Sequence, residues 1–148
     1  MPSASIQTKV VINAPVKQVF DYVSDITRHG EWSADSVQIV PLSSGPIAVG
    51  HQYLSTAQSR GITFKAEIEV TEFGPPKRFA FKGSDETGQF SHRFTFELQR
   101  DGTLVTRQTH LSANWIQTPI FLVALYPLRV FAARKALRLL KEKIEKTR

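Results

Sequence analysis

Residues 10–25, Val-Val-Ile-Asn-Ala-Pro-Val-Lys-Gln-Val-Phe-Asp-Tyr-Val-Ser-Asp, contain the change of periodicity that decides the fold. From Ser5 to the Asn-Ala-Pro triplet, apolar residues alternate with other residues, which predicts a strand. After Pro15 they recur every three or four residues, which predicts a short amphipathic helix to about Asp25. Pro15 suits the first turn of that helix, because its missing N–H would have no partner there. A second short turn of helix is expected over residues 27–32.

The region from Ser36 to Ser112 has a period of two, which predicts β-strands. Turn-forming clusters divide it into short connected runs, so an antiparallel meander is expected. The predicted strands are one around Val37 and Ile39, followed by residues 51–58, 62–73, 78–84, 90–100 and 104–112. The predicted breaks between the later strands are Arg60-Gly61, Gly74-Pro75-Pro76, Glu86-Thr87-Gly88 and Asp101-Gly102.

The segment from about Thr118 to the C-terminus is predicted to be one long helix. Its apolar residues are spaced three and four apart and form one stripe: Val123, Tyr126, Val130, Ala133, Leu137, Leu140 and Ile144. Pro127 removes a backbone hydrogen bond, so a kink is expected there. Residues 121–125 are apolar on all sides, and we expect them to be buried on more than one side.

The charge of the chain is concentrated at its end. Residues 129–148 carry eight basic and two acidic residues, which accounts for the whole net charge of +6. A nucleic-acid-binding protein would carry basic residues across a folded face, so no nucleic-acid partner is expected. The basic helix is either a solvated face or a surface for peripheral contact with anionic lipid headgroups.

Several classes of site are excluded by composition and motif. The chain has no cysteine, which excludes disulfides, thiolate metal sites and cysteine nucleophiles. It has no metal-ligand spacing and no phosphate-binding loop, so no metal and no cofactor are expected. The N-terminus does not resemble a signal peptide, and the longest apolar run, nine residues from Ile120, is too short to span a bilayer. A cytoplasmic protein is expected.

The order of these elements, the segment at residues 10–25, the Trp32 that follows, and Gly-Pro-Ile-Ala-Val-Gly at residues 45–50 resemble the SRPBCC superfamily. This superfamily includes START-like and birch-pollen-allergen-like proteins, and the nearest branch is that of polyketide cyclase/dehydrase and lipid-transport proteins. The resemblance implies one α+β domain over residues 1–148 with a helix-grip fold. About six or seven antiparallel strands would curve around the long C-terminal helix, with two short helices after the first strand and a hydrophobic cavity between sheet and helix.

Alternation assigns the inward faces of the strands. The even positions of residues 90–98 are mostly aromatic and are predicted to face inward. With Asp101-Gly102 as a two-residue turn, Leu98 would lie opposite Val105 and Phe96 opposite Arg107, so Arg107 would point inward. A one-residue bulge would turn Arg107 outward instead. The turn at Arg60-Gly61 similarly pairs Ala57 with Phe64, Ser55 with Ala66, Tyr53 with Ile68 and His51 with Val70.

The predicted interior combines aromatic walls with few polar groups, which is typical of a small-molecule site. Arg107 is the most informative candidate, since a buried guanidinium needs an acidic partner, water or an anionic ligand. His92 and His51 are candidates for hydrogen bonding or for acid–base chemistry. The candidate ligand-binding residues are Trp32, His51, Tyr53, Phe64, Phe81, His92, Phe94, Arg107, Phe121 and Leu125.

Two functions fit the predicted fold and interior. The first is binding or carriage of a small hydrophobic ligand, such as a lipid, an isoprenoid or a polyketide-like aromatic molecule. The second is a cyclase or aromatase acting on a poly-β-ketone, with Arg107, Tyr53 and His92 as candidate catalytic groups. The chain is expected to be a monomer or a homodimer.

Overall fold

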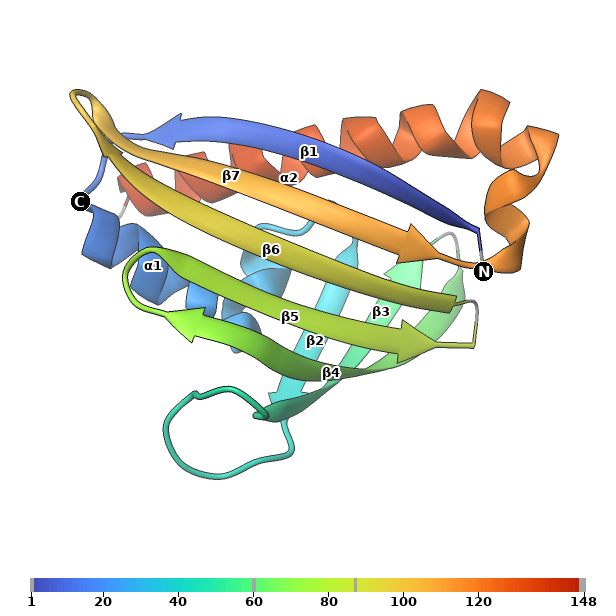
Figure 1. Cartoon of the computed structure of the whole chain (residues 1–148), viewed down its shortest axis with the longest axis horizontal. Helices are drawn as coiled ribbons and strands as arrows, with labels where there is room; N and C mark the ends of the chain where they lie inside the picture. Colours follow the sequence, from blue (N-terminus) through green and yellow to red (C-terminus); the bar gives the residue numbers. More distant parts are fainter. Residues whose placement is uncertain (1, 60, 87, 147–148) are drawn as a thin grey trace.

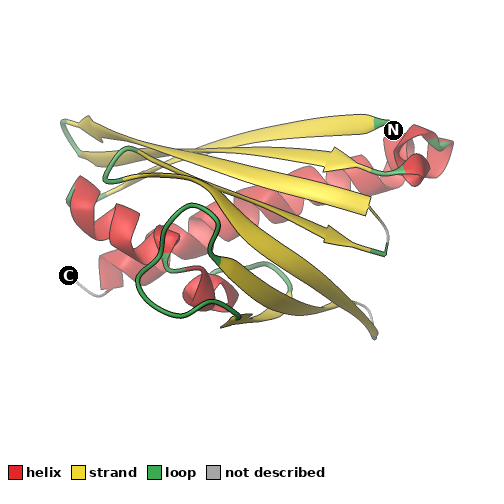
Figure 2. Cartoon of the chain, turned by 60° about the horizontal axis from the view of Figure 1, so that its bottom comes forward, coloured by secondary structure: helices red, strands yellow, loops and turns green. Residues whose placement is uncertain are grey.

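A strongly curved antiparallel sheet with a long helix packed along it forms the body of the protein, as the computed structural model shows (Figures 1 and 2). The structure describes residues 2–59, 61–86 and 88–146. The sheet has seven strands in the order β1-β7-β6-β5-β4-β3-β2. The strands are β1 (Ser3–Ile12), β2 (Ser36–Pro41), β3 (Gln52–Ser59), β4 (Ile62–Gly74), β5 (Arg78–Asp85), β6 (Gly88–Gln99) and β7 (Gly102–Ser112).

The helices lie after the first strand and after the last one. They are α1 (Val16–Ser24), the 3₁₀ helices η1 (Ile26–Glu31) and η2 (Asn114–Gln117), the π-helical turn η3 (Phe121–Leu125) and α2 (Tyr126–Lys146). This arrangement confirms the predicted helix-grip architecture, with two short helices after β1 and a long C-terminal helix. Arg60 and Thr87, predicted to lie in turns, are outside the described residues.

Side chains of α2 bond to the backbone of β1 and of Asn13, the residue that follows it. The Tyr126 hydroxyl donates to the Ser5 carbonyl over 3.1 Å, and the Lys141 ammonium donates to the Val11 carbonyl over 3.0 Å. The Asn13 amide donates to the Glu145 carboxylate over 3.0 Å, and Lys141 also pairs with Glu145. The helix is therefore fixed along the outermost strand at three levels.

The register of the β6–β7 hairpin differs from the predicted one by two residues. Gln99 pairs with Gly102, so Arg100 and Asp101 form the tip of the turn, and Phe94 rather than Phe96 lies opposite Arg107. Since side chains alternate with a period of two, a shift of two leaves every residue on its predicted face. Three of the pairings predicted for β3 and β4 are confirmed: Ala57 with Phe64, Ser55 with Ala66 and Tyr53 with Ile68. His51 lies just before β3, and its carbonyl accepts a hydrogen bond from the Val70 amide over 2.9 Å.

Two predictions of burial are wrong. Leu98, expected to face inward, is 78% exposed because it lies close to the β6–β7 turn, at the end of the sheet. Residues 121–125 are not buried on several sides: Phe121 is buried, whereas Val123 is 79% exposed. The region also contains the expected irregularity, since a π-helical turn precedes Pro127 and the Tyr126 amide donates to the Phe121 carbonyl. Figure 1 shows these first turns running at an angle to the rest of α2.

The core consists of two separate apolar clusters. The main cluster joins the inner face of the sheet to α1, η1 and the second half of α2, with Phe20, Trp32, Phe79, Phe94 and Leu140 almost fully buried. The second cluster lies at the other end, where residues 113–126 pack on Ala4 and Leu111. The first half of α2 is thus held at its start by a small cluster of its own.

Gly102→Ala should lower the free energy of unfolding by about 2 kcal/mol. Gly102 has a φ of +133°, and a Cβ there would lie 2.1 Å from the Ile12 carbonyl oxygen, so backbone must move. Chemical denaturation of the two proteins measures the difference. Gly45→Ala is the matched control, because Gly45 has a φ of +84° but no atom within 4 Å of its added Cβ. If both variants lose equal stability, the contact with Ile12 is not the cause.

Candidate functional site

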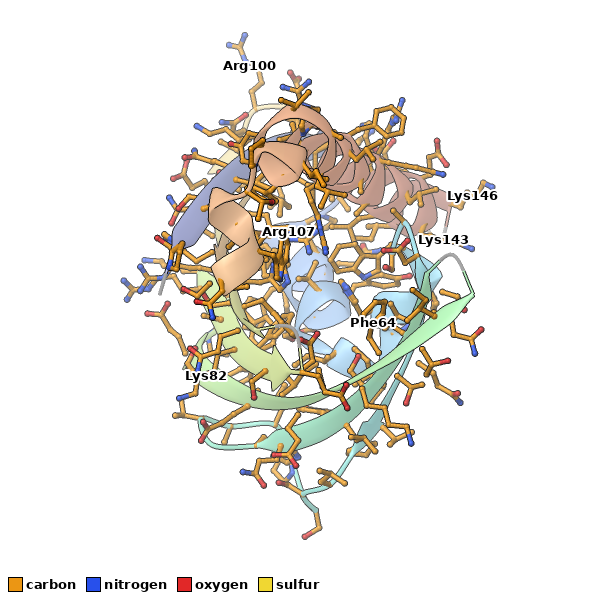
Figure 3. All side chains as sticks on the ribbon, turned by 90° about the vertical axis from the view of Figure 1, so that its right-hand side faces the viewer. Phe64, Lys82, Arg100, Arg107, Lys143 and Lys146 are labelled. Atoms are coloured by element: carbon orange, nitrogen blue, oxygen red, sulfur yellow. The ribbon has the colours of Figure 1, made fainter. Side chains whose placement is uncertain are left out.

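Arg107 lies on the inner face of the sheet, in the strand next to edge strand β1. It sits on β7 between Thr8 of β1 and Phe94 of β6, and all three side chains are buried. Only 8% of Arg107 is exposed. Figure 3 shows its side chain on the inner side of the curved sheet. The prediction that Arg107 points inward is confirmed.

The guanidinium of Arg107 has weak partners. Its Nε lies 3.4 Å from His92 Nδ1, and one of its terminal nitrogens lies 3.3 Å from the same atom. His92 Nδ1 is also 2.8 Å from the Thr109 hydroxyl oxygen. Among the described residues, no acidic side chain forms an ion pair with Arg107. The rings of Trp32 and Phe94 lie 5.7 Å from its central carbon. The two hydrogen bonds of Arg107 to His92 are therefore long and share one acceptor atom, and no acidic side chain of the described residues supplements them.

Burial and charge set the protonation of this group. Burial lowers the pKa of Arg107 to about 10, which still leaves it charged at neutral pH. Burial and the nearby positive charge of Arg107 hold the pKa of His92 well below its ordinary value. Since Arg107 has no acceptor atom, the contact requires an unprotonated Nδ1 on His92. His92 is thus a neutral imidazole with its proton on Nε2.

His29 belongs to the same group of residues, although it is not among the candidates predicted from the sequence. Its ring lies 4.4 Å from that of Trp32, edge to face. Loss of hydration, together with the charge of Arg107, lowers the pKa of His29 to about 3. A signal for it was present in the sequence, because residues three apart in a 3₁₀ helix lie one above the other. His29 and Trp32 have that spacing at the predicted second helical turn.

Two buried polar atoms of this region have no hydrogen-bond partner among the described residues: the Thr8 hydroxyl oxygen and the Trp32 indole nitrogen. Thr8 lies directly across from Arg107, and the Trp32 ring stands over the guanidinium. Buried polar groups are normally satisfied, so an unsatisfied set is a feature that calls for an explanation. The Thr8 hydroxyl and the Trp32 indole N–H are thus two further polar groups in the aromatic surroundings of Arg107.

The structure brings five of the predicted residues together. The ring of Trp32 is 6.1 Å from that of Phe94, and the ring of Phe81 is 5.2 Å from that of His92. Arg107 contacts three of these residues, as described above. We call Arg107, His92, Thr109, Trp32, Phe94, Phe81, His29 and Thr8 the Arg107 group.

The other predicted residues lie elsewhere. Tyr53 is buried and His51 half-buried, with their rings 5.5 Å apart on the β3 side of the sheet. Phe64 is half-buried on β4, and Figure 3 shows it on a different part of the curved sheet from Arg107. Phe121 and Leu125 belong to the second apolar cluster, in which Phe121 packs on Trp115.

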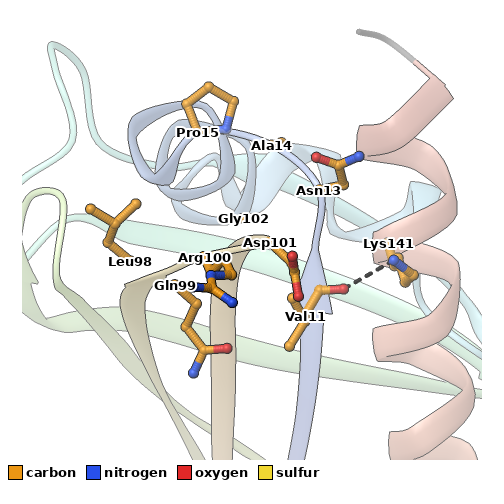
Figure 4. Close-up of a pocket in the computed structure, with 10 residues that line it drawn as sticks. All are labelled: Val11, Asn13, Ala14, Pro15, Leu98, Gln99, Arg100, Asp101, Gly102 and Lys141. Atoms are coloured by element: carbon orange, nitrogen blue, oxygen red, sulfur yellow. Dashed lines mark hydrogen bonds between the residues drawn. The ribbon is translucent and has the colours of Figure 1, made fainter.

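Two open hollows on the surface are formed by other residues. The first, of about 670 Å³, lies between the end of β1, the β6–β7 turn and Lys141 (Figure 4). The second, of about 680 Å³, lies beside α1 and Arg28. Neither contains a residue of the Arg107 group. In the first hollow the Lys141 ammonium donates to the Val11 carbonyl and forms an ion pair with Glu145, so its charge is already paired.

Within the described parts of the chain, no three His, Asp or Glu side chains are grouped so that they could hold a metal ion. No described helix is both long enough and apolar enough to cross a membrane.

Comparisons with known proteins place the chain in a family. The profile of the family described as polyketide cyclase/dehydrase and lipid transport matches residues 3–145. No curated protein matches the chain. Protein TTHA0849 from Thermus thermophilus superposes with a TM-score of 0.78 at 14% identity, with 97% of this chain and 99% of that chain covered.

Two further structures show the same fold. A START superfamily protein from Mycobacterium smegmatis has a TM-score of 0.77 at 13% identity, covering 97% of this chain and 99% of that one. The Zhui aromatase/cyclase from Streptomyces sp. R1128 has a TM-score of 0.76 at 12% identity, covering 98% and 95%. These identities establish the fold alone, whereas the family match spans nearly the whole chain. The chain therefore belongs to the polyketide cyclase/dehydrase and lipid transport family.

Proposed function

We propose that the protein binds a small hydrophobic molecule that ends in an anionic or electron-rich oxygen group, such as a carboxylate or an enolate. The observation that carries this proposal is the buried guanidinium of Arg107, which has no acidic partner among the described residues. A planar fork of donors suits a carboxylate or an enolate oxygen. The unsatisfied Trp32 indole N–H is a further donor beside it.

The apolar part of the ligand would contact the aromatic residues around Arg107. Trp32, Phe81 and Phe94 supply flat apolar surfaces next to the polar group. Tyr53, His51 and Phe64 on the β3–β4 side, and Phe121 with Leu125 at the other end, are proposed as more distant walls. An apolar site with a few convergent polar groups is the usual composition of a small-molecule site.

The family and its neighbours support two uses of such a site. The family description includes both cyclase/dehydrase activity and lipid transport, and one structural neighbour is an aromatase/cyclase. For a cyclase, the donors of Arg107 would stabilise the negative oxygen of an enolate. That chemistry also needs an acid or base with a pKa near neutral.

The candidate acid–base groups favour binding over catalysis. The pKa of His92 is held well below its ordinary value, so the imidazole is a weak base and is rarely protonated at neutral pH. Burial raises the pKa of the Tyr53 hydroxyl, which makes it a weaker acid. Both groups can donate or accept hydrogen bonds, but neither is tuned for proton transfer near pH 7. We therefore place binding or carriage first and a cyclase second.

A pair of matched probes tests the proposal. We expect 11-(dansylamino)undecanoic acid to bind, with a rise in dansyl fluorescence, and its methyl ester to bind at least about tenfold more weakly, because only the acid offers a carboxylate to Arg107. Native mass spectrometry of the same mixtures would give the stoichiometry. Equal binding of acid and ester, or binding of neither, would contradict the proposal.

A further inference from the structure

The outer side of the helical segment from residue 120 to residue 131 is apolar and exposed. Four large side chains on it are exposed by 47–79%. The exposed positions 120, 123, 124, 127, 128 and 131 follow the three-and-four spacing of one helix side. We call the four large side chains the apolar ridge: Ile120, Val123, Leu128 and Phe131.

The same side of the helix continues as a basic surface. Arg134, Lys135 and Arg138 are exposed and lie three, four and seven residues after Phe131. No acidic residue occurs in the sequence from residue 102 to residue 141. The apolar ridge is thus followed along one helix face by three basic residues, and the first acidic residue of the helix, Glu142, lies four residues beyond the last of them.

The apolar ridge is fixed in this outward orientation. Phe121 on the opposite side is 1% exposed and packs on Trp115 and Tyr126. Farther along α2, Leu137 and Leu140 are fully enclosed in the main core. Turning the ridge inward would require both apolar clusters to open. Figure 1 shows the start of this helical segment at a corner of the molecule, beyond the end of the strands, where a flat surface can approach it.

We propose that this helix face docks on the surface of a lipid bilayer that contains anionic lipids. The apolar ridge would enter the boundary between headgroups and acyl chains, and Arg134, Lys135 and Arg138 would contact the anionic headgroups. Amphipathic helices bind membranes in this way: their apolar side chains are buried at the headgroup boundary, and their basic residues are attracted to anionic lipids. The proposal concerns the surface of the molecule and does not depend on the ligand proposed for the Arg107 group.

Charge decides between a bilayer and a second copy of the chain. In a two-fold dimer through the apolar ridge, the same patch of each copy faces the other. In a pair with parallel helices, the three basic side chains beside the ridge would approach those of the partner. In a pair with antiparallel helices, they would face the partner's residues before the ridge, and no acidic residue occurs there either. Like charges at an interface are unfavourable, whereas an anionic membrane neutralises them.

Sedimentation with vesicles tests the proposal. We expect the protein to sediment with vesicles of phosphatidylcholine containing about 30% phosphatidylglycerol and to bind pure phosphatidylcholine at least about tenfold more weakly. The double variant Val123→Ser/Phe131→Ser should lose most of the binding. The triple variant Arg134→Gln/Lys135→Gln/Arg138→Gln should weaken binding to the anionic vesicles at least about tenfold, and salt at about 0.5 M should do the same to the native protein.

Matched variants on other surfaces serve as controls. Ile62 and Leu98 are exposed apolar residues on distant strand ends, and Ile62→Ser/Leu98→Ser should bind like the native protein. Lys65→Gln/Lys77→Gln/Arg100→Gln removes the same number of exposed charges elsewhere. The proposal is overturned if the native protein ignores anionic vesicles, or if the control variants lose binding as much as the ridge variants. A dimer in sedimentation velocity that Val123→Ser/Phe131→Ser converts to monomer would also overturn it.

Discussion

Arg107→Met should make the protein more stable and, at the same time, unable to distinguish a carboxylate from its ester. Burial lowers the pKa of Arg107 from its ordinary value to about 10, and this shift corresponds to a cost of about 3 kcal/mol for keeping the buried group charged. Methionine fills similar space without a charge. After allowance for the lost contacts with His92, we expect a gain of about 2 kcal/mol in the free energy of unfolding and a rise of about 4–8 °C in Tm.

The loss of binding should be larger. Charged hydrogen bonds from a buried guanidinium contribute about 3 kcal/mol, so the Kd of the dansyl acid should rise by about a hundredfold, to the level of the ester. Calorimetry and fluorescence titration measure the two effects. Arg93→Met is the matched control, because Arg93 lies on β6 with an exposed side chain paired to Glu72. A lower Tm for Arg107→Met would mean that the guanidinium is already satisfied in the folded protein.

Acid should destabilise the protein through His29 and His92. The pKa of His29 falls from 6.5 to about 3 on folding, so between these values the unfolded chain binds a proton that the folded protein does not. Its stabilising contribution is complete above pH 6.5 and is lost as the pH falls towards 3. For His29 alone the loss is about 2 kcal/mol at pH 5 and about 3 kcal/mol at pH 4.

His92 acts in the same direction, because its pKa is also lowered by burial and by the charge of Arg107. Urea denaturation at pH 7, 5 and 4 would measure the slope. His29→Gln should reduce the loss between pH 7 and 4 by about 3 kcal/mol. His110→Gln, at an exposed histidine of β7 bonded to Ser5, is the matched control for loss of a histidine at the surface. An unchanged slope in His29→Gln would show that His29 takes up its proton as readily in the folded state.

Patterns of period two and of three to four residues were enough to predict the fold and the inward position of Arg107. The hairpin register was wrong by two residues, because the sequence does not determine which pair of residues 99–102 forms the tip of the turn. Because side chains alternate between the two faces of a strand, an error of two residues left Arg107 on the predicted face. The face on which a strand residue lies is thus predicted more reliably than the residue that it pairs with.

The composition of the site was harder to predict than its centre. His29 lies in the 3₁₀ helix η1, and its ring contacts Trp32, which in turn lies over Arg107. A six-residue segment does not determine the length or the type of such a helix. Residues 121–125, which include the candidate ligand-binding residues Phe121 and Leu125, are expected from the sequence to be buried on more than one side. Instead Phe121 and Leu125 close a separate cluster, and their neighbour Val123 is exposed.

The bonds between α2 and β1 also bear on how molecules of the protein avoid one another. β1 is an edge strand, and an unpaired edge is a template on which strands of other molecules can add. Tyr126, Lys141 and Glu145 occupy backbone groups of Ser5, Val11 and Asn13 along this edge. The opposite edge, β2, has only six residues and ends at Pro41. Both borders of the sheet are therefore protected against intermolecular strand pairing, which is a route to aggregation.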